Sequence, residues 1–219
     1  MSQLALFLIL CVIAATLYNA YKKSQTLKRS ALIDSYAFPQ TMTRNICKKY
    51  PHLNTQQAEQ VIDGLREYFH ICNIAGKYRV AMPSQVVDVA WHEFILFTLQ
   101  YKKFCTKALG RFLHHTPAEA MPSRSSAQKG IKKAWKIACQ RENISSTTPE
   151  KLPLLFALDT LLAIPDGFNY APNCKTSSNN NAYCASHIGC TSGCSTGCSS
   201  DSSDSSCDSS GCSGGCGGD

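Results

Sequence analysis

The chain has 219 residues, of which 13 are cysteine, and its formal net charge is +7 at pH 7. Residues 1–172 carry 21 Lys and Arg against 11 Asp and Glu, whereas residues 173–219 carry one Lys and four Asp, so the body is basic and the tail mildly acidic. This charge does not indicate a nucleic-acid partner, because the sequence shows no base-reading module and no basic stripe with interleaved aromatic residues. The length predicts one domain of about 140 residues between two appendages.

The N-terminus is an uncharged apolar run that covers residues 2–21. About twenty helical residues span roughly 30 Å, the thickness of the hydrocarbon core of a bilayer. We therefore predict a transmembrane anchor at 1–21, followed by a basic juxtamembrane helix or linker at 22–39.

The cations that follow this run set the expected topology. The positive-inside rule predicts a single-pass membrane protein whose body and tail are cytoplasmic, and the same cations are expected to bind anionic lipid headgroups. The alternative is a cleaved signal peptide and a secreted or extracytoplasmic protein, but no Lys or Arg precedes the apolar run, and Tyr18 is bulky where the cleavage site needs a small residue. The cations are Lys22, Lys23, Lys28 and Arg29.

The middle of the chain, 40–168, is predicted to be a helical domain. Apolar residues recur there at steps of three and four, and no alternating run is long enough to require a sheet. Asn54 and Gln57 form the pattern of a capping box, and Gly76 and Gly110 are expected helix ends. The predicted fold class is all-α, a small helical bundle with a single N-terminal transmembrane helix and a disordered tail. The expected helices cover 41–50, 54–76, 83–110, 125–141 and 153–163.

The predicted central helix concentrates the candidate functional residues. Trp91 lies on the face expected to be buried. Asp88 and His92 are four residues apart on an edge of that face, where the carboxylate can orient the imidazole. The simplest interpretation of His92 is a hydrogen-bonded structural residue, and a metal ligand or an acid–base group is the alternative.

A zinc site made of His92, Cys105, His114 and His115 conflicts with one continuous helix. Thirteen residues separate His92 from Cys105, which corresponds to about 20 Å along a helix, whereas zinc holds its ligands within about 2.3 Å. The few residues after Gly110 are not expected to fold back to His92. Partners of His92 are therefore expected from other helices, for example His70 or Cys72.

A wider motif runs through the same stretch. The residues Trp91-His92, Tyr101, Cys105, Gly110-Arg111 and Leu113 resemble the signature of the glycine-rich domain-containing protein family. This chain departs from the family pattern at Phe94, where a second His is common, and at Thr98, where a Pro is common and where its absence lets the helix continue. The resemblance implies a domain type and no established reaction. The candidate functional residues are Asp88, Trp91, His92, Tyr101, Cys105, Gly110, Arg111, His114 and His115.

The C-terminal segment, 169–219, is predicted to be a low-complexity tail. From Asn173 it consists mainly of Ser, Gly, Cys, Asn and Asp, so it cannot bury a core and is expected to be disordered. In a cytoplasmic chain its thiols favour zinc or another soft metal, or thiol exchange, over structural disulfides. Incidental cysteines and an extracytoplasmic disulfide-linked tail are the alternatives. The candidate metal ligands are Cys190, Cys194, Cys198, Cys207, Cys212 and Cys216.

Three functions stay open at this point. A membrane-tethered binding or scaffold module with an unidentified protein partner is favoured, because no complete catalytic constellation is visible. The second is an enzyme centred on His92 and Asp88, and the third is a carrier of a modifiable Gly-Cys tail.

Overall fold

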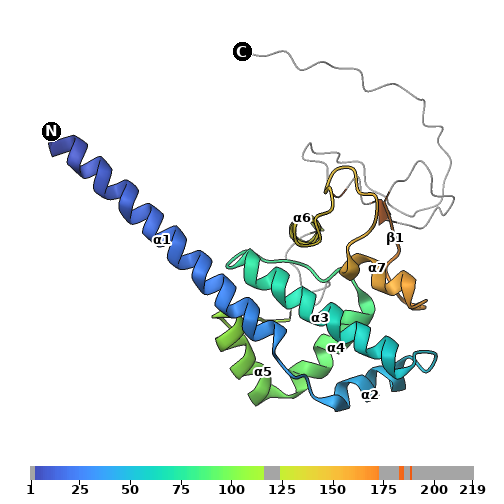
Figure 1. Cartoon of the computed structure of the whole chain (residues 1–219). Helices are drawn as coiled ribbons and strands as arrows, with labels where there is room; N and C mark the ends of the chain where they lie inside the picture. Colours follow the sequence, from blue (N-terminus) through green and yellow to red (C-terminus); the bar gives the residue numbers. More distant parts are fainter. Residues whose placement is uncertain (1–2, 116–123, 173–182, 185–187, 189–219) are drawn as a thin grey trace, which may run out of the picture.

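The computed structural model describes residues 3–115, 124–172, 183–184 and 188, and within them it confirms the all-α class (Figure 1). One pair of two-residue strands, β1 (Tyr170–Ala171) and β2 (Tyr183–Cys184), runs parallel beside the helices. Most of the predicted tail, including its six candidate cysteine ligands, lies outside the described residues. The helical elements are α1 (Gln3–Asp34), α2 (Gln40–Lys49), α3 (Thr55–Ala75), α4 (Gln85–Leu96), α5 (Thr98–Phe104), the π-helical turn η1 (Cys105–Leu109), α6 (Arg124–Arg141) and α7 (Leu154–Leu161).

The predicted anchor and the juxtamembrane segment form one continuous helix, α1, whose N-terminal part projects away from the domain (Figure 1). This helix contains a stretch that is long and apolar enough to cross a membrane, and none of that stretch is buried against the rest of the protein. A signal sequence has the same properties, so the structure establishes the apolar helix and not the topology.

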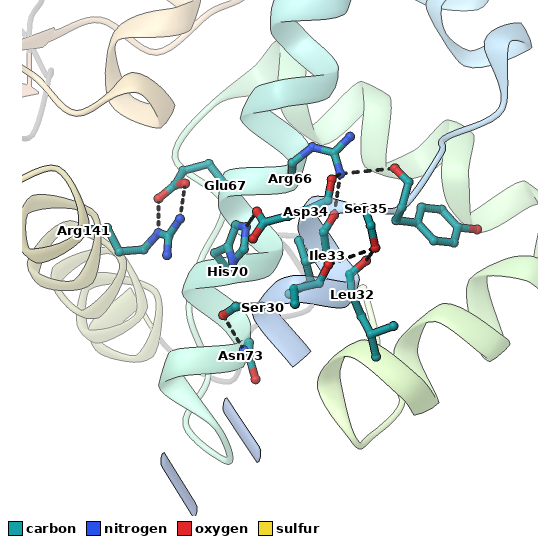
Figure 2. A network of polar contacts seen from close by, with 12 residues as sticks. Ser30, Leu32, Ile33, Asp34, Ser35, Arg66, Glu67, His70, Asn73 and Arg141 are labelled. Carbon is teal, nitrogen blue, oxygen red and sulfur yellow. Dashed lines mark hydrogen bonds and ion pairs between the residues drawn. The ribbon is translucent and has the colours of Figure 1, made fainter. Parts of the chain in front are cut away.

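The C-terminal turns of α1 are bonded to α3 by polar side chains (Figure 2). Arg66 donates hydrogen bonds to the carbonyl oxygens of Ile33, Asp34 and Tyr36, at and just beyond the C-terminal end of this helix, where carbonyl groups lack the regular helical donors. Asn73 Nδ2 donates to the carbonyl oxygen of Thr26 at 3.0 Å. The exposed helix is therefore joined to the domain by a fixed contact.

Helix α3 lies at the centre of the domain and contacts α1, α2, α4, α6, α7 and η1. Its start has the predicted capping box, in which Gln57 N donates to Asn54 Oδ1 at 2.8 Å and Asn54 N donates to Gln57 Oε1 at 2.9 Å. It ends at Gly76, whose φ of 60° lies in the left-handed region that favours glycine. Both predicted ends of this helix are confirmed.

The prediction of one continuous helix over 83–110 is wrong. Helix α4 ends at Leu96, Phe97 leaves the helical conformation with φ −79° and ψ 57°, and α5 begins at Thr98. On a straight helix Phe104 would lie about 15 Å along the axis from Phe94, whereas the break brings the two rings to a centroid distance of 5.4 Å. Packing of both rings in one aromatic core is the physical reason for the break, and the absence of a proline at Thr98 does not prevent it.

Candidate metal centre

Two histidines and one carboxylate meet at the surface of α4. His115 Nε2 lies 3.1 Å from Asp88 Oδ1, and His92 Nδ1 lies 3.5 Å from Asp88 Oδ2. The two imidazoles face each other, with 3.4 Å between His92 Nε2 and His115 Nδ1. One ligand atom from each of the three residues lies within 4.8 Å of the others. The arrangement therefore gathers three potential metal ligands from positions 88, 92 and 115.

This cluster overturns the expectation that residues beyond Gly110 cannot return to His92. Gly110 adopts a φ of 68°, which reverses the chain after η1 at little cost for a glycine. Together with the break at Phe97, this reversal directs residues 111–115, here called the return segment, back to α4. The expectation assumed an unbroken helix, so the break at Phe97 removes its basis for Cys105 as well as for His115. Among the described residues, Cys105 is nevertheless not part of this group of ligand atoms.

The return segment is held in place by the residues of the sequence motif. Trp91 Nε1 donates a hydrogen bond to the hydroxyl oxygen of Tyr101 at 3.0 Å, and that hydroxyl donates to the carbonyl oxygen of Leu113. Burial raises the pKa of the Tyr101 hydroxyl far above its usual range, so the group remains a proton donor. Arg111 Nε donates to the carbonyl oxygen of Gly76 at 2.9 Å. Most of the motif therefore positions His115.

The ring of His115 itself packs against two neighbours. Its centroid lies 4.6 Å from that of Trp91 in an edge-on contact and 4.1 Å from that of His92. The side chains of Asp88 and His115 are 22% and 17% exposed, whereas that of His92 is 52% exposed. The cluster is thus supported from inside by Trp91 and open to solvent on the side of His92.

Other predicted members of the site lie elsewhere. Cys105 is fully buried, and burial raises the pKa of its thiol, which disfavours the thiolate that binds metals. His114 is exposed and contacts the ring of Phe112. The two partners of His92 expected from α3 are not part of the cluster. His70 Nε2 lies 2.7 Å from Asp34 Oδ1 instead. Burial raises the pKa of the Cys72 thiol to about 12, which disfavours the thiolate.

A buried carboxylate that the sequence analysis did not single out fixes the start of α4. Asp159 accepts hydrogen bonds from Ser84 Oγ at 2.7 Å, from the backbone N–H groups of Gln85 at 2.7 Å and Val86 at 3.1 Å, and from Phe168 N at 2.8 Å. A carboxylate is favourable at a helix N-terminus, where free N–H groups and the helix dipole attract negative charge. The only sequence signal was one Asp inside the apolar run of 153–163.

The chemistry of the cluster matches that of a transition-metal site. Two imidazoles and one carboxylate bind zinc or iron(II) in many proteins, and a set of three protein ligands leaves a position for water or another small ligand. For metal–ligand bonds of about 2.0–2.1 Å, tetrahedral geometry separates the ligand atoms by roughly 3.3 Å. Asp88 contacts His92 Nδ1 and His115 Nε2, whereas the two imidazoles contact each other through His92 Nε2 and His115 Nδ1, and one ligand atom from each residue lies within 4.8 Å of the others. Binding of one ion therefore requires a small adjustment of these side chains. Hydrogen bonds join His115 Nε2 to Asp88 Oδ1 and His92 Nε2 to His115 Nδ1.

The fold and this cluster define a small helical domain with an apolar N-terminal helix and a site of two histidines and one carboxylate. A family profile described as UCP032817-like matches residues 28–188, most of the chain, and the chain belongs to this family, whose function is uncharacterised. The matched region starts in the part of α1 that contacts α3 and includes Asp88, His92 and His115. Neither the search of curated proteins nor the search of solved structures finds a match. The comparisons do not show the glycine-rich domain-containing family, so that resemblance rests on the motif residues alone.

Proposed function

We propose that this protein binds a divalent first-row transition-metal ion through Asp88, His92 and His115, and that α1 holds the metal-binding domain at a membrane. The observation that carries the proposal is that one ligand atom from each of these three residues lies within 4.8 Å of the others. Each Asp88 oxygen contacts one imidazole, at 3.1 Å for His115 and 3.5 Å for His92. Nitrogen and oxygen ligands in this combination favour zinc, iron(II) or a related ion over calcium or copper(I).

The number and exposure of the ligands support an exchangeable site. Structural zinc sites are usually closed by four protein ligands, often thiolates. Here three ligands converge, and the His92 side chain is half exposed, which leaves room for water or a small oxygen ligand. An ion in such a site polarises the ligand in its open position. The proposal therefore favours the interpretation of Asp88 and His92 as functional residues over the purely structural one.

The position of the basic residues supports a cytoplasmic domain. Lys22, Lys23, Lys28 and Arg29 follow the apolar run, and cytoplasmic ends of membrane spans are enriched in such cations. Reporter fusions after Asp219 measure this directly, and activity of a periplasmic or lumenal reporter would reverse the proposed topology.

Cobalt(II) absorption spectroscopy tests the metal site in the full-length protein purified in detergent. Cobalt(II) bound by imidazole and carboxylate gives visible ligand-field bands, whereas cobalt(II) bound by the tail cysteines adds an intense thiolate charge-transfer band in the near ultraviolet. We expect a component without thiolate character that disappears in His92→Ala and in His115→Ala. Both variants retain the complete tail, so the difference spectrum isolates the cluster.

His114→Ala is the matched control, because His114 is adjacent in sequence, exposed and outside the cluster. This variant should retain the full difference spectrum and the same cobalt affinity as the natural chain. Equal spectra for the natural chain and His115→Ala, or equal losses in His114→Ala and His115→Ala, would overturn the proposal.

A further inference from the structure

The direction in which α1 leaves the domain is set by its contacts with α3. Asn73 contacts Thr26 and Ser30, and His70 contacts Asp34, so residue numbers rise along α3 as they fall along α1 (Figure 2). The two helices are therefore antiparallel. The C-terminal end of α3 points in the direction in which the apolar part of α1 extends (Figure 1).

This end of α3 lies close to the point where the apolar run ends. Thr26, the partner of Asn73, is four residues from Lys22, which corresponds to about 6 Å along the helix. The chain that follows α3 carries Lys77, Tyr78 and Arg79, all of them exposed. These side chains are thus placed beside the first charged residues of α1.

Two further segments add cations to the same end of the domain. The Arg111 guanidinium is bonded to the carbonyl oxygen of Gly76, and Gly110 lies directly against the Arg29 guanidinium. Lys133 of α6 lies over the Tyr78 ring, with 5.0 Å from Nζ to the ring centroid. We call this surface the basic end. Its cations are Lys22, Lys23, Lys28, Arg29, Lys77, Arg79, Arg111 and Lys133.

Acidic residues are absent from the described segments that form the basic end. The stretches that form it contain no Asp or Glu in residues 1–33, 68–87, 94–118 or 124–141. Within the part of the chain that the structure describes, none of its eight cations forms an ion pair with a carboxylate. Among the described residues, the surface therefore carries positive charge that no carboxylate pairs with, from four segments that are distant in sequence.

We propose that the basic end docks on the anionic lipid headgroups of the membrane that α1 enters. Cations near the surface of an anionic bilayer are attracted to its headgroups, and tyrosine is favoured at the headgroup level. Tyr78 is 60% exposed at the centre of this surface. Docking extends lipid contact from the juxtamembrane helix to the folded domain and fixes the orientation of the domain. The proposal does not depend on the metal site.

Tryptophan quenching in proteoliposomes tests the docking in the full-length protein. Tyr78→Trp is reconstituted into vesicles of phosphatidylcholine alone or of phosphatidylcholine mixed with phosphatidylserine, both containing a lipid with a spin label on its headgroup. The signal of the natural chain, from the buried Trp91 and Trp135, is subtracted. Leu161→Trp is the control, because Leu161 is 69% exposed and lies beside Gln60 and Asp63, towards the opposite end of α3.

We expect strong quenching of Tyr78→Trp in the anionic vesicles and little quenching of Leu161→Trp. The additional substitutions Lys77→Gln and Arg79→Gln should reduce the quenching, and so should salt near 1 M, where the Debye length falls to about 3 Å. Quenching of Tyr78→Trp no greater than that of Leu161→Trp would overturn the proposal. Equal quenching of Tyr78→Trp in neutral and anionic vesicles would also overturn it, because the anchor alone would then place the domain.

Discussion

The hydroxyl group of Tyr101 donates a hydrogen bond to the carbonyl oxygen of Leu113, twelve residues further along the chain. It also accepts one from Trp91 Nε1, so a single buried oxygen joins α4, α5 and the return segment. His115 follows Leu113 by only two residues, so the position of His115 depends on this hydrogen bond although His115 takes no part in it. The Tyr101–Leu113 bond therefore supports the candidate metal centre without touching it.

Tyr101→Phe tests this support. The substitution removes the donor to Leu113 and leaves Trp91 Nε1 and the Leu113 carbonyl without this buried partner, which should cost about 1–3 kcal/mol of unfolding free energy. Loss of a residue that orients a metal ligand typically weakens metal binding by about 10–100-fold. Urea denaturation followed by tryptophan fluorescence measures the first effect, and cobalt titration measures the second.

Tyr78→Phe is the control for Tyr101→Phe, because the Tyr78 side chain is largely exposed and lies outside the return segment. It should change the unfolding free energy by no more than about 0.5 kcal/mol. If Tyr101→Phe behaves like Tyr78→Phe in both measurements, the return segment is held by other contacts.

Local chemistry made part of this fold predictable from the sequence. Asn54 and Gln57 form a reciprocal capping box at the start of α3, and Gly76 and Gly110 supply the positive φ with which their helices end. Each of these signals acts within a few residues. The apolar run of α1 is equally local, because a long uncharged stretch is visible without knowledge of the tertiary structure.

The break at Phe97 had no such signal. Neither proline nor glycine is present, and the helical periodicity continues across the break, so only the packing of Phe94 against Phe104 reveals it. The prediction for His115 failed for the same reason, because its distance from His92 was calculated along a straight axis. The pairing of Asp88 with His92, four residues apart on one helix, needed no tertiary information and was predicted.

Gly64→Ala should destabilise the contact between α3, α4 and α7. A Cβ atom at Gly64 would overlap Leu158 Cδ1 and would lie 2.9 Å from Val87 Cγ2. Overpacking of a buried contact costs about 1–3 kcal/mol, more than the roughly 1 kcal/mol that alanine gains over glycine in a helix. Thermal unfolding of the purified protein measures the change.

A double-mutant cycle with Leu158→Ala identifies the cause of that change. Leu158→Ala alone should cost about 2–5 kcal/mol through the cavity it leaves. In the double variant the new methyl group at position 64 occupies part of this cavity, so the combined cost should be smaller than the sum of the two single costs. Additive costs would show that Leu158 is not the residue that excludes a side chain at position 64.

Asp159→Asn should weaken the start of α4. The asparagine keeps one acceptor oxygen, but it loses the charge and presents an NH2 group to backbone N–H donors. Hydrogen bonds to a charged group contribute about 1.5–3 kcal/mol, and we expect a loss of this size in the unfolding free energy. Asp63→Asn is the control, since its side chain is 67% exposed and its Oδ1 atom lies 4.0 Å from Arg66 Nε. A loss equal to that of Asp63→Asn would contradict the anchoring role of Asp159.

The buried His70 should make the protein less stable as the pH is lowered. Burial lowers the pKa of its imidazole below the ordinary 6.5, and the Arg141 charge lowers it further, although Asp34 and Glu67 act in the opposite direction. The geometry agrees, because Nε2 faces Asp34 while Nδ1 has no hydrogen-bond partner among the described residues. A second proton would therefore add a buried N–H group without an acceptor.

The direction of the change in stability with pH follows from the pKa of His70, which is lower in the folded chain than in the unfolded chain. Between the lowered folded-state pKa and 6.5, the unfolded chain binds more protons at this position, so the unfolding free energy falls as the pH is lowered through 6.5 towards the folded-state value. His70→Gln should therefore make the decline as the pH falls through 6.5 shallower, even though it lowers the absolute stability through loss of the Asp34 contact. His114→Gln, which removes an exposed imidazole, is the control. Urea denaturation at a series of pH values measures both slopes, and an unchanged slope in His70→Gln would show that His70 takes up its proton equally in both states.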